Sequence, residues 1–325
     1  MLALLQENLI PEIPLADWVE DFVDFITGNF RFLFNGIRDA IAFFVESLEA
    51  ILTTPPELVM VAIFAVIAYF LAGWKTAMFS AIGFVLLMAL QASGQSLWEP
   101  AMLTLALVLA STVVSLIIGV PIGILAAKSR ATEVAVKPVL DLMQTMPAFV
   151  YLVPMIVFLG LGPGPGLVAT VIFAAPPAVR LTMLGIQQVP RNTVEAAQAF
   201  GATPWQTLRK VELPQALPTI MAGVNQVIML ALSMVVIAAL VGAGGLGEVV
   251  TRGLSQLRVG NAFVGGLGIV IIAVYLDRVT RNLGRTTRRK PGKGGMITKV
   301  FPGKKVDRED PNTVGARAGT GGGSP

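Results

Sequence analysis

The chain has 325 residues, of which 54% are hydrophobic and only 14% charged, a composition typical of repeated transmembrane helices and not of a soluble protein. It contains no cysteine and no histidine, which excludes disulfides, thiol chemistry and every nucleophile activated by a histidine base. No segment matches the phosphate-binding loop GxxxxGK[ST], so we expect no catalytic residue, no metal site and no bound nucleotide in this chain.

The N-terminal part of the chain is acidic. Residues 1–56 contain nine acidic and two basic side chains, and Leu15, Trp18 and Phe22 recur there at helical spacing. A second apolar stripe follows Gly28-Asn29 and consists of Leu33, Ile37, Ile41, Phe44, Leu48 and Ile51. We expect an acidic amphipathic helical extension, interrupted near Gly28-Asn29, that lies outside the membrane or in its interface. A small soluble helical hairpin explains the same pattern.

About seven hydrophobic segments follow, each near the ~20 residues needed to cross a bilayer. We expect spans at about 57–73, 76–92, 100–127, 138–160, 165–187, 217–241 and 261–280. The first two, within residues 57–96, are short and are expected at the periphery of an all-α, polytopic membrane protein.

Basic residues in the loops predict the orientation. With seven spans, the following lysines and arginines all fall on one side: Lys75, Lys128, Arg130, Lys137, Arg191, Arg209 and Lys210. The positive-inside rule makes that side cytoplasmic and leaves the N-terminus outside. Residues 282–325, rich in glycine and basic side chains, are expected to form a disordered cytoplasmic tail.

The predicted spans contain a few charged and polar side chains, which are energetically costly within a membrane unless they are paired, solvated or functional. Asp141 and Arg180 both lie toward the cytoplasmic ends of their spans, where they either form an ion pair or are merely solvated. Gln144 and Asn225 suit a translocation path, although hydrogen bonds between helices are the more common role of such groups.

Proline residues are expected to interrupt two of the spans. Pro147 and Pro154 lie in the fourth span, and Pro176-Pro177 lie in the fifth. Broken helices offer carbonyl groups to a cation, and Phe149 and Tyr151 could supply aromatic faces beside them. Simple structural kinks with packed aromatic side chains are the alternative interpretation.

A polar segment at residues 190–214 separates the fifth and sixth predicted spans. Its spacing is Glu195-Ala196-Ala197, three residues, Gly201, nine residues, Val211, one residue, Leu213-Pro214. We expect Thr193 to cap a first short helix and Glu195 to lie in its first turn, where it complements the helix dipole. Gly201 permits a sharp turn, and Pro204 begins a second short helix. An ordinary cytoplasmic loop with a charged amphipathic helix is the alternative.

The glycine-rich segment 242–247 is expected to end the sixth span, with a short helix from Glu248 to Leu257 on the outer surface. The expected external loop, residues 242–260, contains Arg252 and Arg258 despite the positive-inside rule. These three charged residues either form a gate or docking site for an external partner or are simply solvated.

The spacing in the polar segment 190–214 resembles that of the coupling loop in the permease subunits of binding-protein-dependent ABC importers, with Val211 in place of isoleucine. We therefore call this segment the coupling loop. Segments 140–154, 172–190, 223–247 and 264–281 are similar to the glycine betaine/proline betaine permeases and their choline-transporting relatives. The similarity covers roughly residues 97–281, so it implies a type I, MetI-like permease core there.

The resemblance also implies partners and a location. The implied partners are a second permease copy, two copies of a separate ATPase that binds ATP and Mg, and an external substrate-binding protein. The implied location of this chain is the bacterial inner membrane. The coupling loop is then expected to contact the ATPase through Glu195, Ala196, Ala197, Gly201, Val211, Leu213 and Pro214. We expect no nucleic-acid partner. The alternatives are a secondary transporter, for which only Asp141 offers a buried acid, and a membrane scaffold that transports nothing.

Overall fold

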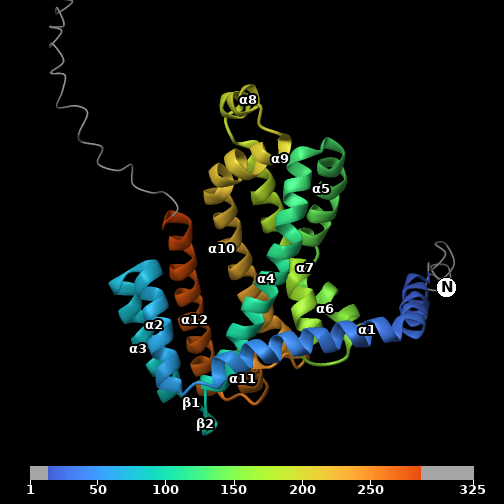
Figure 1. The fold of residues 1–325 in the computed structure, drawn as a ribbon. Helices are drawn as coiled ribbons and strands as arrows, with labels where there is room; N and C mark the ends of the chain where they lie inside the picture. The colour runs from blue at the N-terminus through green and yellow to red at the C-terminus, as the bar shows by residue number, and fades with distance from the viewer. Residues whose placement is uncertain (1–13, 287–325) are drawn as a thin grey trace, which may run out of the picture. The chain divides into compact units, whose positions relative to one another are not determined.

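The computed structural model describes residues 14–286, with side chains from Asp17 to Arg281 and at Pro14. The predicted basic tail therefore lies almost wholly outside the described residues. The elements in chain order are α1 Leu15–Thr53, α2 Glu57–Ala72, α3 Trp74–Ala89, β1 Gln91–Ala92, β2 Gln95–Ser96, α4 Trp98–Lys128, α5 Arg130–Thr145, α6 Ala148–Leu159, α7 Pro163–Gln187, α8 Arg191–Ala199, α9 Pro204–Thr207, α10 Leu213–Ala238, α11 Gly245–Ser255 and α12 Val259–Thr286. The all-helical membrane architecture predicted from the sequence is confirmed (Figure 1).

Helices α4, α7 and α10 form the centre of the described fold. Glycines let these helices approach closely, because a Cβ atom built at Gly119 of α4 would lie 2.6 Å from Ala178 Cβ of α7. A Cβ at Gly123 would lie 2.7 Å from both Thr182 Cβ and the Val179 carbonyl oxygen. The spacing Gly119–Gly123 is therefore a close-packing motif of the kind that joins helices within membranes.

Helices α2 and α3 pack together and lie against α12. Aromatic rings fill this contact: Phe64 and Phe84 stack with centroids 4.5 Å apart, and Tyr275 meets both rings edge-on. Because each of α2 and α3 has 16 residues, each measures about 24 Å, less than the ~30 Å hydrocarbon thickness of a bilayer.

Each of the seven predicted spans coincides with one or two described helices, although not every one of these helices alone has the length of a full span. Four described helices are long and apolar enough to cross a membrane, and the number rises to six if each of two bent helix pairs is one span. The two pairs are α1 with α2, bent by 97°, and α5 with α6, bent by 95°. Helix α3 is a shorter apolar helix.

The acidic extension is helical from Leu15 to Thr53, with a kink beside the expected interruption at Gly28-Asn29. Helix α1 continues past Gly28-Asn29, and the predicted interruption is a single non-helical residue, Phe30. The helix contacts α4, α6 and α7, and Phe34 stacks on Phe158 of α6 at 4.8 Å. Its packed face includes Val45 and Leu52. Three members of the predicted second stripe are exposed instead: Leu33, Ile37 and Ile51.

The fourth predicted span, 138–160, is wrong as a continuous helix. It divides into α5 and α6, which meet at 95° around Met146-Pro147. Met146 is extended, as a residue before proline prefers, and Pro147 precedes the first residue of α6. Pro154, in contrast, lies within α6 and does not end it.

The predicted interruption at Pro176-Pro177 is also wrong, because α7 runs through both prolines. Both side chains are buried, and α7 contacts α4, α6 and α10 along its length. We attribute the continuity to this packing, which holds the helix straight enough to tolerate two missing backbone donors.

The functional segments lie at opposite ends of the helices. Figure 1 shows α8 and α9 at one end of the bundle, and α11 with the β1–β2 hairpin at the other. The hairpin pairs Gln91 with Ser96 and Ala92 with Gln95, with Ser93 and Gly94 in the turn, both at positive φ. The hairpin lies between the second and third predicted spans, where only a loop was expected.

Candidate functional site

The first helix of the coupling loop is α8. Pro190 precedes its first residue and no side chain caps it, so the predicted cap at Thr193 is wrong, because Thr193 lies inside the helix. Glu195 is also outside the first turn, which contains no acidic residue. The effect of the helix dipole decays within one turn, so the predicted dipole role of Glu195 does not apply.

The turn between α8 and α9 has the predicted glycine. Gly201 has φ +81°, a conformation that glycine adopts readily and that L side chains disfavour. Its N–H donates to the Gln198 carbonyl, and the Ala202 N–H donates to the Ala197 carbonyl. A Cβ atom at Gly201 would meet nothing within 4 Å, so the glycine is required by the backbone and not by crowding.

A capping box begins α9. The Thr203 hydroxyl accepts from the Gln206 N–H, and the Gln206 side chain accepts from the Thr203 N–H. Pro204 occupies the first turn of α9, as expected. This cap was not predicted, although Thr203 and Gln206 have the spacing that identifies a capping box.

Helix α8 presents its side chains to solvent. None of its residues is buried; Glu195 and Ala196 are exposed, and Ala197 is half-buried. The adjoining turn and α9 add two exposed aromatic side chains, Phe200 at 93% and Trp205 at 66%. Neither aromatic residue was predicted to be part of a contact surface.

The second half of the coupling loop is not a separate short helix. Helix α9 continues through a π-helical turn, Leu208–Glu212, directly into α10. Leu208 is buried, Val211 and Leu213 are half-buried, and Pro214 is exposed. Val211 and Leu213 therefore lie partly within the bundle, whereas the exposed contact surface is concentrated on α8, Phe200 and Trp205.

At the same end of the molecule, the predicted pair of Asp141 and Arg180 is present. An Arg180 guanidinium nitrogen donates to an Asp141 carboxylate oxygen and so joins α5 to α7. The Asp141 side chain is 66% exposed and the Arg180 side chain is 40% exposed. Gln144 and Phe149 are also exposed, on either side of the α5–α6 bend at Pro147.

Tyr151 does not present an aromatic face to open space. Its ring is 7% exposed and packs in a cluster that includes Leu152, Ala169 and Met234. Its hydroxyl donates to the Met143 carbonyl, the group that would accept from residue 147 if that residue were not proline. Tyr151 thus satisfies the backbone group that the α5–α6 bend leaves free.

Asn225 joins two helices. It donates to the Asp277 carboxylate at 3.4 Å and accepts from the Thr280 hydroxyl at 2.8 Å, linking α10 to α12. Asp277 also pairs with Arg281 at 2.7 Å. Asn225 is half-buried, so its amide serves this network between helices.

At the opposite end, the short helix predicted from Glu248 is present as α11. The glycine segment ends α10 as predicted, because Gly242 and Gly244 adopt positive φ values of +81° and +83°. Glu248 and Arg252 form an ion pair one turn apart along α11. A hollow of ≈ 290 Å³ beside them is also lined by carboxylates from α1 and α4, Glu49 and Glu99.

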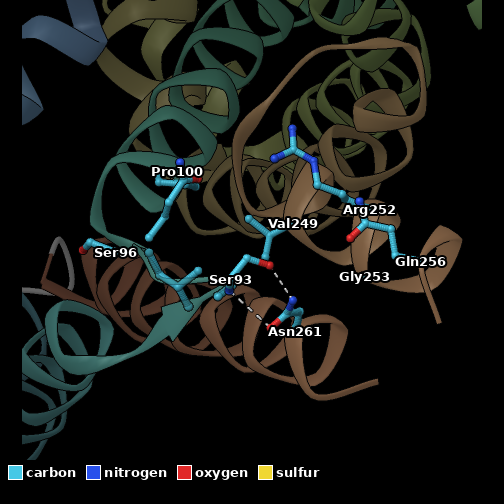
Figure 2. A pocket seen from close by; sticks show the side chains of 11 residues that line it. Ser93, Ser96, Pro100, Val249, Arg252, Gly253, Gln256 and Asn261 are labelled. Atoms are coloured by element: carbon cyan, nitrogen blue, oxygen red, sulfur yellow. Dashed lines mark hydrogen bonds between the residues drawn. The ribbon is translucent and has the colours of Figure 1, made fainter. Parts of the chain in front are cut away.

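Beside α11, a second hollow lies against the hairpin (Figure 2). Asn261 points to Ser93, donating to its hydroxyl at 2.7 Å and accepting from its N–H at 3.4 Å. Arg258 donates to the same hydroxyl at 3.3 Å. This end of the described fold therefore has a polar surface built from α11, α12 and the hairpin.

Comparison with known proteins agrees with this arrangement. Residues 119–289 match the family of binding-protein-dependent transport system inner membrane components. The chain is 50% identical to the glycine betaine transport system permease protein OpuAB of Bacillus subtilis (strain 168) over 274 residues, which cover 84% of this chain and 95% of OpuAB. It is 45% identical to the glycine betaine/proline betaine transport system permease protein ProW of Escherichia coli (strain K12) over 296 residues, 89% of this chain and 82% of ProW.

A solved structure supports the same relationship. An inward-facing conformation of the MetNI methionine ABC transporter matches with a TM-score of 0.52 and 25% identity, covering 57% of this chain and 93% of the matched chain. Family model, close relatives and fold all agree. The chain belongs to the family of binding-protein-dependent transport system inner membrane components, and is a permease subunit of an ABC importer.

Proposed function

We propose that this permease carries glycine betaine, proline betaine, choline or related quaternary amines across the bacterial inner membrane. The substrate class is supported by relatives named for glycine betaine and proline betaine transport that match over more than four fifths of the chain. The single observation that supports coupled transport is the exposed helix α8, held by the Gly201 turn at one end of the bundle.

We propose that α8 docks into the ATPase. Ala196 leaves a surface without long side chains that another protein can approach closely, and Phe200 and Trp205 extend this surface with aromatic area. Exposed aromatic side chains are typical anchors of protein interfaces. In this proposal, ATP and Mg bind the ATPase, and closure of two ATPase copies moves α8.

The proposal extends to the orientation of the chain and to the remaining partners. The α8 end is proposed to face the cytoplasm together with the C-terminus, and the N-terminus to lie outside. The external substrate-binding protein would then dock at the α11 end, near Glu248, Arg252 and Arg258. Two permease copies would form the translocation path. The residues that we propose to lie along this path are Asp141, Gln144, Pro147, Phe149, Tyr151 and Asn225.

Uptake measurements test the proposal directly. The permease would be reconstituted in vesicles with its ATPase and binding protein, and uptake of labelled glycine betaine and choline measured with and without a lesion in the nucleotide site of the ATPase. We expect uptake that the lesion abolishes. Uptake that persists with the lesion would indicate an ion-driven transporter, and no uptake by an assembled complex would refute the substrate class.

A further inference from the structure

An ion pair between a buried carboxylate and a partly exposed ammonium connects the coupling loop to α4. The Lys128 ammonium, on the last residue of α4, contacts Oε2 of Glu212, on the last residue of the π-helical turn. The Glu212 side chain is only 6% exposed, whereas Lys128 is 43% exposed. Among the described residues, no other basic side chain forms an ion pair with Glu212.

The surroundings of this pair are apolar. Leu208, Ala216 and Ile220 from the α9–α10 segment cluster with Ile186 of α7, and Ile124 and Ala127 of α4 pack against them. A buried carboxylate is expensive unless it is paired, and an apolar side chain at position 212 would suit this cluster at least as well. The pair therefore serves mainly to fix the end of α4 relative to α10, and contributes less to the free energy of unfolding.

The π-helical turn places Glu212 at this junction. The Leu213 N–H donates to the Leu208 carbonyl, five residues back, and Pro214 has no N–H to donate to Lys210. One additional residue in the turn rotates all that follows by about 100° relative to an uninterrupted α-helix. The exposed face of α9 and the buried face of α10 are thereby set in their relative positions.

We propose that Lys128 and Glu212 are positioning residues that make the cytoplasmic ends of α4 and α10 move as one unit. When the ATPase displaces α8 and α9, the continuous α9–α10 helix transmits the movement to α10, and the ion pair transmits it to α4. This inference rests on the proposed docking of α8. It adds a specific route by which that movement reaches the centre of the bundle.

The test measures coupling and not uptake alone. In vesicles containing the complete complex, the number of ATP molecules hydrolysed per glycine betaine taken up would be compared between wild type, Lys128→Gln and Glu212→Gln. We expect each variant to raise this ratio by about fivefold or more, the lower range of coupling between distant sites. The exchange Lys128→Glu with Glu212→Lys is expected to return the ratio toward the wild-type value.

Glu133→Gln is the matched control. Glu133 pairs with Arg130 at 3.0 Å and Lys137 at 2.7 Å, both on α5, so its loss removes a carboxylate nearby without separating two elements. An unchanged ratio in Lys128→Gln would overturn the proposal, as would an equal rise in Glu133→Gln. Lys128→Gln alone decides the question if Glu212→Gln does not assemble.

Failure of the proposed substrate is distinguishable from failure of this inference. If the wild-type complex takes up no glycine betaine, the rate of ATP hydrolysis by the ATPase is measured instead. This rate is compared with and without the permease and the binding protein, and the ratio of the two rates is the stimulation factor. A stimulation of ATP hydrolysis that is lost in Lys128→Gln but kept in Glu133→Gln supports the ion pair as the link between α4 and α10. Its retention in both variants refutes the link.

Discussion

Substitution of Gly201 separates docking of the coupling loop from folding of the permease. A non-glycine residue at φ +81° carries about 1–2 kcal/mol of backbone strain, and aspartate lies at the low end because its short side chain can hydrogen-bond locally. A Cβ at this position meets nothing within 4 Å, so no steric term is added. We therefore expect Gly201→Asp to insert and fold with a loss of about 1 kcal/mol.

Transport is expected to respond far more strongly than stability. A carboxylate and a distorted turn within the proposed docking surface should reduce ATP-driven uptake at least about tenfold, equivalent to about 1.4 kcal/mol of lost docking free energy. Uptake in vesicles, co-purification of the ATPase and the thermal unfolding midpoint of the permease in detergent would be measured on the same preparations.

The matched control is Gly160→Asp, in the connection between α6 and α7. Gly160 has φ +78°, and a Cβ there also meets nothing within 4 Å, so the folding penalty is matched. We expect normal uptake by Gly160→Asp. Wild-type uptake by Gly201→Asp would refute the docking role, and equal loss in both variants would show that backbone strain alone explains the defect.

Three further predictions concern the helices around the proposed path. Tyr151→Phe leaves a backbone carbonyl without its hydroxyl donor and should destabilise the protein by about 1–3 kcal/mol, seen as a lower thermal midpoint. Gly123→Ala should cost about 1–3 kcal/mol through overpacking against α7, whereas Gly36→Ala, with nothing within 4 Å, should not destabilise the protein. Asp141→Asn breaks an exposed pair and should change stability by less than about 1 kcal/mol, so a large loss of uptake would indicate a role in transport and an unchanged uptake would exclude one.

Short-range chemistry accounts for the parts of the coupling loop that the sequence analysis predicted correctly. Gly201 and Pro204 act through their own backbone preferences. Their roles in the turn and at the start of α9 could therefore be predicted from the sequence without knowledge of the tertiary structure. The cap at Thr203 was equally readable from Gln206 three residues later. The cap predicted at Thr193 failed because Pro190 already supplies a favourable start three residues earlier.

Proline residues show where local preference is insufficient. Pro147 ends a helix and Pro176 does not, although both lie in apolar segments. The difference lies in the neighbours: α7 is enclosed by α4, α6 and α10, whereas the α5–α6 bend is stabilised by the hydroxyl of Tyr151. Neither the enclosure nor the hydroxyl's partner can be deduced from sequence spacing.

Composition and motif spacing determined the class of this protein by themselves. Long apolar segments require helices in a bilayer, and the spacing from Glu195 to Pro214 resembles that of the permeases of binding-protein-dependent importers. The tertiary structure decided how the segments meet: the bend at Pro147, the close contact at Gly123 and the Lys128–Glu212 pair. The physical reason is range, because backbone preferences act over a few residues, whereas close packing and buried charge depend on groups that only the fold brings together.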